Sequence, residues 1–350
     1  MPRGVHLVGS VPLADAEEVF RLSSEVLGRH LRRLPDGETG HRLFWNSWTR
    51  GLYERTPGLE LVDPPEGSYT PWKQARLVVD PLELEFGPIG YADAARDSWA
   101  LFSRLKREGA IPGHVRFQVC IPSPIAPMIV LVEEGSRAGV EGPFRRRLYE
   151  EVQEIVDAVP HEELAIQWDV CQEVLVHEGF FPDRPTDYKR QIVAELARLG
   201  DAVPDAADAG YHLCYGSPAD EHLVMPRDMA VMVEMANGLR EALRRRIDFL
   251  HMPVPRDRAD AGYFAPLAGL RGFDDSALYL GLIHHDDREG DRRRIEAARP
   301  FAARFGVAAE CGWGRTDPAR VPGLLESHRA AAELLAGPPA QDRAGRAAQV

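Results

Sequence analysis

The sequence predicts a single (β/α)8 barrel, a TIM barrel of eight parallel strands with helices around them. Short apolar segments alternate with amphipathic helical segments along most of the 350 residues, which is typical of parallel β/α architectures. Polar side chains also follow the end of one apolar segment after another, and in a barrel the carboxyl ends of all strands form one mouth. A doubly wound open sheet is the alternative, and the position of the polar side chains favours the barrel.

The first part of the chain predicts two strands separated by a helix. Residues 5–10 form a short apolar segment that ends in a Gly-Ser pair, and residues 14–27 carry apolar side chains at helical spacing. A weaker strand over 30–34 runs into a tight Pro-Asp-Gly-Glu turn at 35–38. A long irregular stretch, about residues 41–90, follows and contains tryptophans that favour an ordered lid. We therefore expect a long insertion after the second strand.

The remaining chain alternates regularly between helical and strand patterns. The helices are expected at 91–108, 141–159, 188–199, 228–245, near 265, 288–304 and 317–335. The strands are expected at 114–120, 164–169, 211–215, 247–251, 278–284 and 305–311. Residues 1–336 are thus expected to form the barrel domain, and residues 337–350, rich in Ala, Gly, Pro and Gln, a flexible tail.

The composition indicates a soluble protein of the cytoplasm whose partners are small molecules. A formal net charge of -12 disfavours nucleic acids and anionic membranes, because their phosphate groups would be repelled. The four cysteines are widely spaced and follow no apolar leader peptide, which favours a reducing compartment over a disulfide framework. No apolar segment reaches membrane-spanning length.

A metal site is predicted where His212 and Cys214 stand at the end of one strand. Alternate residues of a strand point to the same side, so this imidazole and this thiolate can meet at one point. Cys311 follows a later strand and could supply a third soft ligand across the barrel mouth. Such ligands with an open fourth position suit zinc. The alternative for each residue alone is a buried core position, to which we assign Cys120 and Cys171.

Other ionisable residues stand at the same predicted strand ends. Asp169 ends an apolar strand and could act as a hydrogen-bond acceptor or base, or simply cap the next helix. His251, His284 and His285 are candidate ligands, proton shuttles or ordinary loop histidines. Glu38 lies in the tight turn after the second strand, where its carboxylate could project inward.

These motifs together resemble the catalytic half of cobalamin-independent methionine synthase and its short relatives, in the superfamily that also holds uroporphyrinogen decarboxylase. Five segments carry the resemblance along nearly the whole chain. They are 6–12, similar to the family's Ile-Gly-Ser-Phe-Pro motif, 37–38, similar to its Gly-Glu turn, 166–169, similar to its pterin-binding strand, and 211–215 and 310–312, similar to its His-Met-Cys-Tyr and Asp-Cys-Gly zinc motifs.

The resemblance implies a (β/α)8 barrel with a zinc ion held by His212, Cys214 and Cys311. It also implies that Ser10 and Glu38 bind the substrate amino acid, the glutamate through the amino group. By the same resemblance, the aspartate that ends strand 164–169 would hydrogen-bond a pterin.

The sequence departs from the family in three places. The family takes its fourth zinc ligand from a glutamate on the sixth strand, and the nearest match here is His251, our candidate fourth ligand. The third-strand loop has Met128 where the family has a pterin-stacking tryptophan, so folate is the less expected donor. Val170 and Cys171 replace a Glu-Pro pair after the fourth strand.

The predicted chemistry is the transfer of an alkyl group, most simply methyl, to a metal-bound thiol substrate. Zinc with thiolate and imidazole ligands lowers the pKa of a bound thiol and keeps it as a nucleophilic thiolate. Asp169, His284 and His285 are the candidate catalytic residues, handling protons at the leaving group. Two alternatives stay open: a metal-free decarboxylase or lyase of the same superfamily, and a non-catalytic barrel that binds a small molecule.

Overall fold

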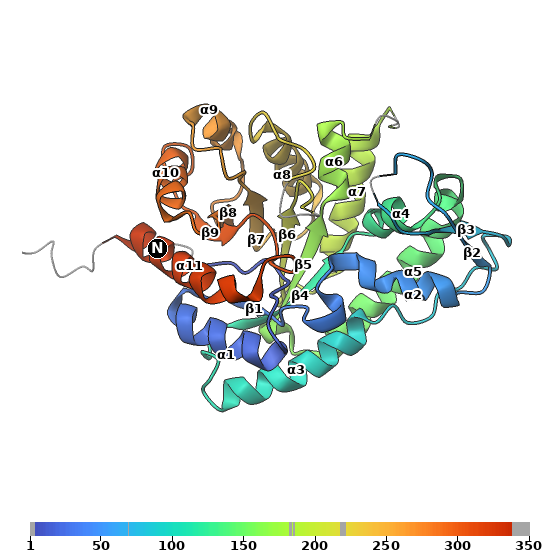
Figure 1. Cartoon of the computed structure of the whole chain (residues 1–350), viewed down its shortest axis with the longest axis horizontal. Helices are drawn as coiled ribbons and strands as arrows, with labels where there is room; N and C mark the ends of the chain where they lie inside the picture. Colours follow the sequence, from blue (N-terminus) through green and yellow to red (C-terminus); the bar gives the residue numbers. More distant parts are fainter. Residues whose placement is uncertain (1–3, 69, 182–183, 185, 218–221, 338–350) are drawn as a thin grey trace, which may run out of the picture.

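A curled parallel sheet forms the centre of the protein, whose computed structural model describes residues 4–337 except 69, 182–183, 185 and 218–221. Seven strands follow one another in the order β1-β4-β5-β6-β7-β8-β9, and each neighbouring pair is parallel. The strands are β1 Arg33–Pro35, β4 Arg116–Pro122, β5 Leu164–Val170, β6 Asp208–Leu213, β7 Phe249–Pro253, β8 Ala277–Ile283 and β9 Gly306–Ala309. Helices surround this sheet (Figure 1), so the architecture is α/β and resembles a TIM barrel.

The central strands are continuous apolar segments because both of their faces are covered. Every residue of β5 and β7 is buried. The few polar side chains inside them are hydrogen-bonded: Gln167 of β5 accepts from His6 Nε2 at 2.8 Å and donates to Val8 O at 2.6 Å. These interior bonds tie the amino-terminal segment to the middle of the sheet.

The helices on the outside of the sheet begin and end close to the predicted boundaries. They are α1 Ala16–Leu27, α3 Tyr91–Arg107, α4 Ile125–Leu131, α5 Arg137–Ala158, α6 Gln172–Glu178, α7 Tyr188–Asp201, α8 Ala230–Ala242, α9 Ala261–Phe264, α10 Arg288–Ala298 and α11 Val321–Ala336. The helix expected over 288–304 ends at Ala298, because Pro300 has no N–H to continue the helical hydrogen bonds. The short helices α4 and α6 were not predicted.

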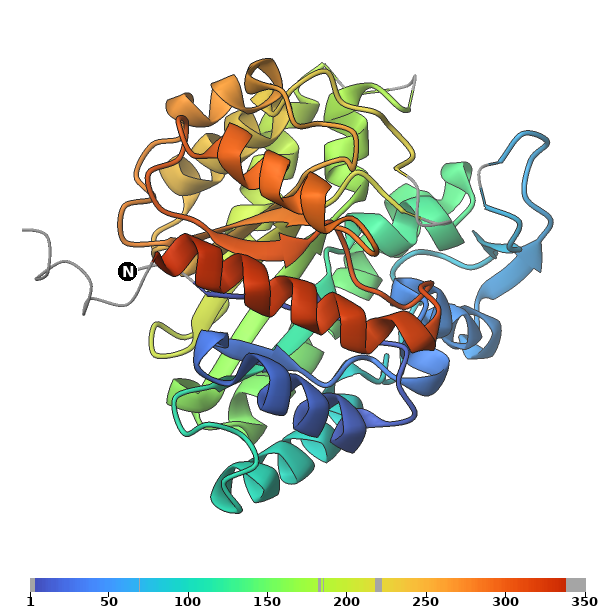
Figure 2. The same cartoon turned by 60° about the vertical axis from the view of Figure 1, so that its left-hand side comes forward.

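The two ends of the described chain meet on one side of the molecule. Helix α11 packs along α1, as Figure 2 shows. None of the helices in the described part of the chain combines the length and apolar character that a membrane crossing requires. The tail expected over 337–350 lies outside the described residues, apart from Gly337.

The segment predicted as the first strand, residues 5–10, is not a regular strand. Val5 forms single parallel bridges with Leu31 and with Val307 of β9, so the segment lies between the two edge strands of the sheet. The chain then leaves this position, and Ser10 O accepts the N–H of Trp313 at 2.7 Å. The apolar pattern thus predicted where the segment lies in the sheet. The irregular backbone of the segment brings Ser10 to the carboxyl ends of the strands.

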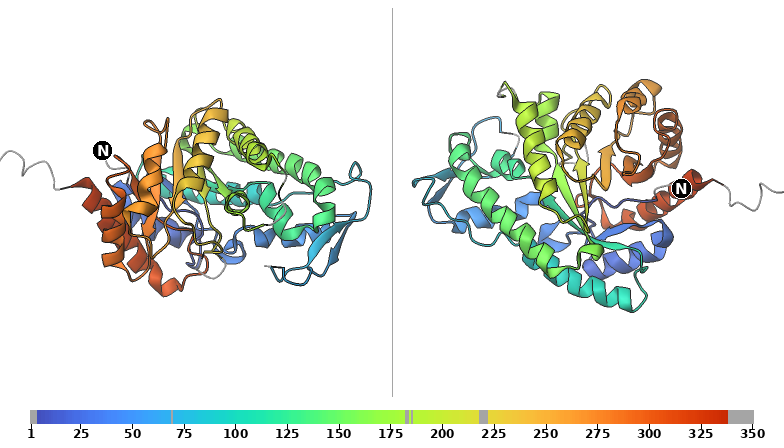
Figure 3. Two further views of the ribbon diagram at one scale, coloured as in Figure 1. Left: turned by 90° about the horizontal axis from the view of Figure 1, so that it is seen from above. Right: turned by 180° about the vertical axis from the view of Figure 1, so that it is seen from behind.

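Residues 41–90, the expected insertion, contain ordered elements of their own. They include the 3₁₀ helix η3 Trp45–Thr49, helix α2 Arg50–Arg55, and the antiparallel pair β2 Leu59–Val62 and β3 Gln74–Leu77. The β2–β3 pair lies at one end of the molecule, away from the central sheet (Figure 3). Helix η3 instead lies where its side chains can reach the ends of the central strands.

Candidate metal centre

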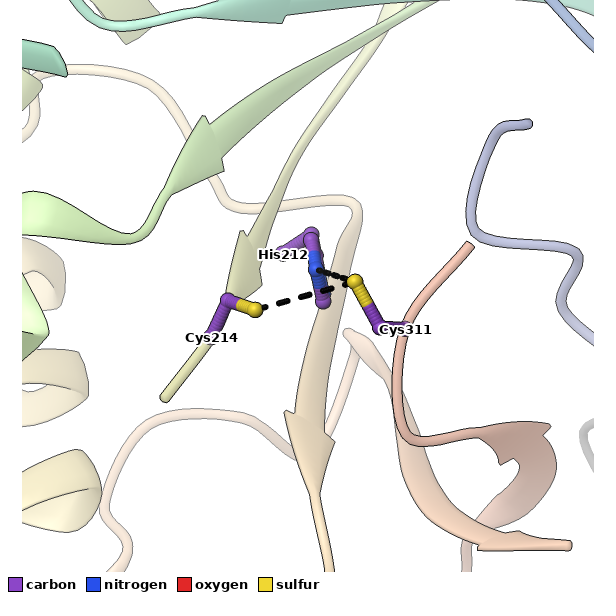
Figure 4. Close-up of side chains that lie close together, drawn as sticks. All are labelled: His212, Cys214 and Cys311. Atoms are coloured by element: carbon purple, nitrogen blue, oxygen red, sulfur yellow. Dashed lines mark hydrogen bonds between the residues drawn. The ribbon is translucent and has the colours of Figure 1, made fainter. Parts of the chain in front are cut away.

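Three soft ligand side chains converge at the carboxyl ends of β6 and β9. The ligand atoms of His212, Cys214 and Cys311 all lie within 4.8 Å of one another. Cys311 Sγ lies 3.8 Å from Cys214 Sγ and 3.8 Å from His212 Nε2 (Figure 4). The three residues therefore meet in the structure, as the sequence predicts.

These spacings fit a tetrahedral zinc ion. With Zn–S bonds of about 2.3 Å and Zn–N bonds of about 2.05 Å, two tetrahedral sulfur ligands lie about 3.8 Å apart and a sulfur and a nitrogen about 3.6 Å apart. The Cys214–Cys311 and Cys311–His212 distances, each 3.8 Å, are close to these values. The cluster could hold a metal ion with little rearrangement of its side chains.

Hydrogen bonds behind His212 leave its Nε2 lone pair facing the cluster. His251 Nε2 lies 3.0 Å from Ala309 O, so this nitrogen carries the proton and donates it. His251 Nδ1 is then an acceptor, and His212 Nδ1–H donates to it at 2.6 Å. Burial lowers the pKa of both imidazoles, so both stay neutral. The expected fourth ligand, His251, therefore lies behind His212 with both ring nitrogens engaged.

The register of the central strands explains this arrangement. Asp169 of β5 pairs with His212 of β6, and His212 pairs with His251 of β7. Registered residues of parallel strands point to the same side of the sheet. The three side chains therefore form one row across the inside of the sheet. The next row begins two residues further along each strand.

A cavity of about 380 Å³ lies against the cluster. The predicted substrate-binding and catalytic residues Ser10, Glu38 and Asp169 line it together with the three metal-ligand candidates. Trp45 and Trp72, from residues 41–90, also line it. The structure thus brings six of the predicted site residues to one cavity that two tryptophans also line.

Two buried carboxyl groups in this cavity have raised pKa values. Burial raises the pKa of Asp169 to about 8, although hydrogen bonds from Gln167 and Trp45 act in the opposite direction. Gln167 Nε2 donates to Asp169 Oδ1 at 2.8 Å. Burial also raises the pKa of Glu38 well above its usual range, and the negative charge of Asp169 adds to this effect. A cationic ligand group between them would favour their ionised forms.

Strained backbone also occurs at this cavity. Glu38 and Trp45 both have φ of 45°, in the left-handed region that residues other than glycine rarely adopt. The Glu38 N–H donates to Asp36 Oδ1 at 2.9 Å, which stabilises the turn. Gly37 is required beside it, because an added Cβ would lie 2.7 Å from Val19 Cγ2. Such strain is concentrated at functional sites in many proteins.

The other two predicted catalytic residues, His284 and His285, lie elsewhere. They line a second cavity of about 400 Å³, which shares Ser217, Cys311 and Gly312 with the first. His284 Nε2 donates to Val254 O at 3.0 Å, and burial lowers its pKa to about 4. His284 is therefore neutral at physiological pH, and the cavity that it lines also contains Cys311.

Several cavity residues were not among the predicted site residues. They include the side chains Trp45, Asn46, Trp72, Cys171, Gln172 and Arg315. Arg315 Nη2 lies 3.7 Å from Cys311 Sγ, where its charge favours a thiolate. The assignment of Cys171 to packing was incomplete, because the residue also lines this cavity. Its position directly after β5, at the end of the strand that Asp169 occupies, could have revealed it.

Comparisons with known proteins identify the fold. No family model and no curated protein sequence matches the chain. A B12-independent methionine synthase from Shewanella sp. W3-18-1, solved in complex with selenomethionine, superposes with a TM-score of 0.65 at 15% identity over 96% of this chain and 98% of that one. A protein described as a vitamin B12-independent methionine synthase from Listeria monocytogenes gives 0.59 at 15% identity over 95% and 97%.

A third solved structure, a methyltransferase from Methanosarcina mazei, gives a TM-score of 0.54 at 14% identity over 95% of this chain and 93% of that one. The chain therefore resembles B12-independent methionine synthase-like proteins in fold along nearly its whole length, which agrees with the resemblance that the sequence motifs suggested.

Proposed function

We propose that this protein is a zinc-dependent enzyme that transfers a methyl group to a thiol substrate of the amino-acid class. The observation that carries the proposal is the convergence of His212, Cys214 and Cys311 at spacings suited to zinc, against a cavity lined by buried carboxyl groups. Zinc in such a site would lower the pKa of a bound thiol and keep it as a nucleophilic thiolate.

The structural neighbours support this class of reaction. Two are described as B12-independent methionine synthases and one as a methyltransferase, and all share the fold over more than nine-tenths of the chain. The Shewanella protein was solved with selenomethionine, an amino acid that carries a methyl group on selenium. An amino acid methylated on sulfur is the corresponding product that we propose here.

The residues of the cavity have distinct proposed roles. Glu38 binds the substrate ammonium group, whose charge favours ionisation of its buried carboxyl. Ser10 helps to position the amino acid, and its Oγ is itself held by the Gly314 N–H at 3.2 Å. The indole rings of Trp45 and Trp72 exclude water from the reacting sulfur.

Proton transfer at the leaving group is assigned to Asp169 and to the second cavity. The Asp169 pKa of about 8 keeps a proton available near neutral pH. His284 and His285 act from the second cavity, which Cys311 also lines, and there His284 is a neutral imidazole that could accept a proton. The methyl donor is a second small molecule, and folate is one candidate to be tested.

The proposal is tested with the full-length protein loaded with zinc. Homocysteine serves as the thiol probe, and 3-mercaptopropionate as its counterpart without an amino group. 5-Methyltetrahydrofolate and methyl iodide serve as a natural-type and a minimal methyl donor. We expect methylation of homocysteine, little methylation of 3-mercaptopropionate, and loss of both activity and metal in the Cys311→Ser variant.

A matched control is Cys120→Ser, because Cys120 Sγ lies 3.2 Å from Val8 O inside the sheet and outside the cluster. It should keep its metal and activity. Full metal retention by Cys311→Ser, or undiminished methyl transfer after chelation, would contradict the proposal. A folded protein without bound metal would instead support the metal-free lyase or the non-catalytic binding barrel.

A further inference from the structure

Cys171 and Cys214 occupy equivalent positions at the ends of two adjacent parallel strands. Val170, the last residue of β5, pairs with Leu213, the last residue of β6. Beyond this pair the Cys214 N–H still donates to Val170 O at 2.9 Å. Residues in register on neighbouring strands are about 4.8 Å apart and point to the same side. The two thiols are therefore neighbours in the row after Asp169 and His212.

Contacts confirm that the two thiols share one environment. Both are buried, both line the cavity against the cluster, and both belong to one apolar group that Cys311 packs against. Cys171 and Cys214 pack against each other with Leu175 at the centre of this group. Three cysteines, rather than two, thus meet at this end of the sheet.

The cluster of three ligands needs a fourth, and two other candidate side chains, His251 and Asp169, are already engaged. Both ring nitrogens of His251 are hydrogen-bonded, to His212 and to Ala309. The Asp169 carboxyl accepts hydrogen bonds from Gln167 and Trp45. Among the described residues that line the cavity, Cys171 is the remaining soft ligand in direct contact with one of the three.

We propose that Cys171 is the fourth protein ligand of this metal centre when no thiol substrate is bound. The inference rests on the proposed metal-dependent function and extends it to a residue at which the resembling family has no cysteine. One histidine and three cysteines form a common tetrahedral zinc set. Cys171 is not among the three residues whose ligand atoms all lie within 4.8 Å of one another, so its side chain must rotate inward to bind.

This longer reach makes Cys171 the ligand that a thiol substrate replaces. With a metal bound, Cys171 would leave it as the substrate sulfur binds, and the Cys171 sulfur would take up the proton of the incoming thiol. The exchange is therefore balanced in charge and protons and requires no additional base. The three other ligands stay in place throughout.

Cobalt(II) substitution of the full chain tests the assignment without any assay of turnover. Sulfur-to-cobalt charge-transfer bands grow with the number of thiolate ligands, so wild type should show three. We expect Cys171→Ala to lose about one third of this intensity, the share of one thiolate among three. Cys120→Ala is the control and should give the wild-type spectrum, because its thiol lies inside the sheet.

X-ray absorption at the zinc edge of the wild-type protein provides a second measurement that needs no variant. We expect three sulfur and one nitrogen neighbours, and one sulfur fewer in Cys171→Ser. Two sulfurs in wild type, or identical cobalt spectra for wild type and Cys171→Ala, would overturn the assignment.

The outcomes also separate this inference from the proposed function. A site with two thiolates that still methylates homocysteine overturns only the role of Cys171. A site with three thiolates that methylates no thiol probe overturns only the proposed reaction. A protein that takes up neither cobalt nor zinc overturns both.

Discussion

The Nδ1 atoms of His212 and His251 lie 2.6 Å apart, and only one of them carries a proton. Because His251 donates its other N–H to Ala309 O, the shared proton belongs to His212. The position that the resembling family gives to a ligand glutamate thus holds a residue that orients His212, which we propose as a ligand. Partners of this kind fix the tautomer and ring position of a metal-binding histidine.

Replacing His251 should therefore weaken metal binding. In His251→Ala the Nδ1–H of His212 loses its acceptor, and metal affinity should fall by about 10- to 100-fold. His251→Gln keeps an acceptor oxygen near Nδ1 and should retain more of the affinity. Competition titration against a chelator measures both variants. Wild-type affinity in a folded His251→Ala protein would show that the hydrogen bond has no role.

Metal affinity should rise with pH across the neutral range. The Cys214 thiol pKa is raised well above its usual range, mainly by its contact with Cys171, and that of Cys311 is raised to about 12, mainly by its contact with Cys214. Both thiols are protonated at neutral pH in the metal-free protein, and each must lose its proton to bind. His212 is already neutral and releases none.

Calorimetric titration in buffers of different ionisation enthalpy should detect at least about two protons released per metal ion. Lower pH restores the competing protons, so the affinity should decrease. A metal affinity that stays constant between pH 6.5 and 8.5 would be inconsistent with thiol ligands in this state.

Asp169 should make the metal-free protein less stable as the pH rises. Its pKa is about 8 in the folded protein, mainly because of burial, against about 3.9 in an unfolded chain. The folded state therefore holds a proton that the unfolded state has lost, and stability decreases between about pH 4 and 8, by at most about 1.4 kcal/mol per pH unit. Glu38 acts in the same direction.

Asp169→Asn removes this ionisation. Urea unfolding of the metal-free proteins should show a stability difference between variant and wild type that grows in favour of the variant from pH 5 to pH 8. Parallel pH dependence of the two proteins would mean that Asp169 is ionised in the folded state.

The loop that carries Cys311 should tolerate no side chain at Gly314. A Cβ there would lie 2.1 Å from Leu43 O, a backbone atom that cannot move aside easily. Gly314→Ala should cost about 1–3 kcal/mol of stability through overpacking and should also weaken metal binding, because the loop must shift. Gly323→Ala is a matched control in α11, where an added Cβ meets nothing within 4 Å.

The control should be neutral or more stable by up to about 1 kcal/mol, since alanine is the better helix former. Thermal unfolding and metal titration of both variants check this pair. Equal stability and equal metal affinity of Gly314→Ala and Gly323→Ala would show that residue 314 does not lie close to Leu43.

The convergence of His212, Cys214 and Cys311 could be predicted from the sequence because it depends on two local rules. Period-two alternation places the first two on one side of a strand, and parallel strands bring their carboxyl ends together. The same rules placed Asp169 correctly at the cavity. Long apolar and amphipathic patterns likewise predicted most helices and strands near their observed boundaries.

The positions that the sequence did not predict depend on tertiary contacts. His251 lies in the same row as His212. Only the distances show that its ring nitrogens are hydrogen-bonded to His212 and Ala309 and do not face the cavity. His284 follows its strand as expected, yet its ring turns to Val254 O and the second cavity. The irregular backbone after Val5 depends likewise on its neighbours on both sides.

The most direct test of the account is to locate the metal in crystals of the protein as purified. Anomalous difference density at the zinc edge should give one peak bounded by His212 Nε2, Cys214 Sγ and Cys311 Sγ, and the peak should be absent from crystals of Cys311→Ser. Density at another site, or an equally strong peak at this site in the variant, would contradict the account.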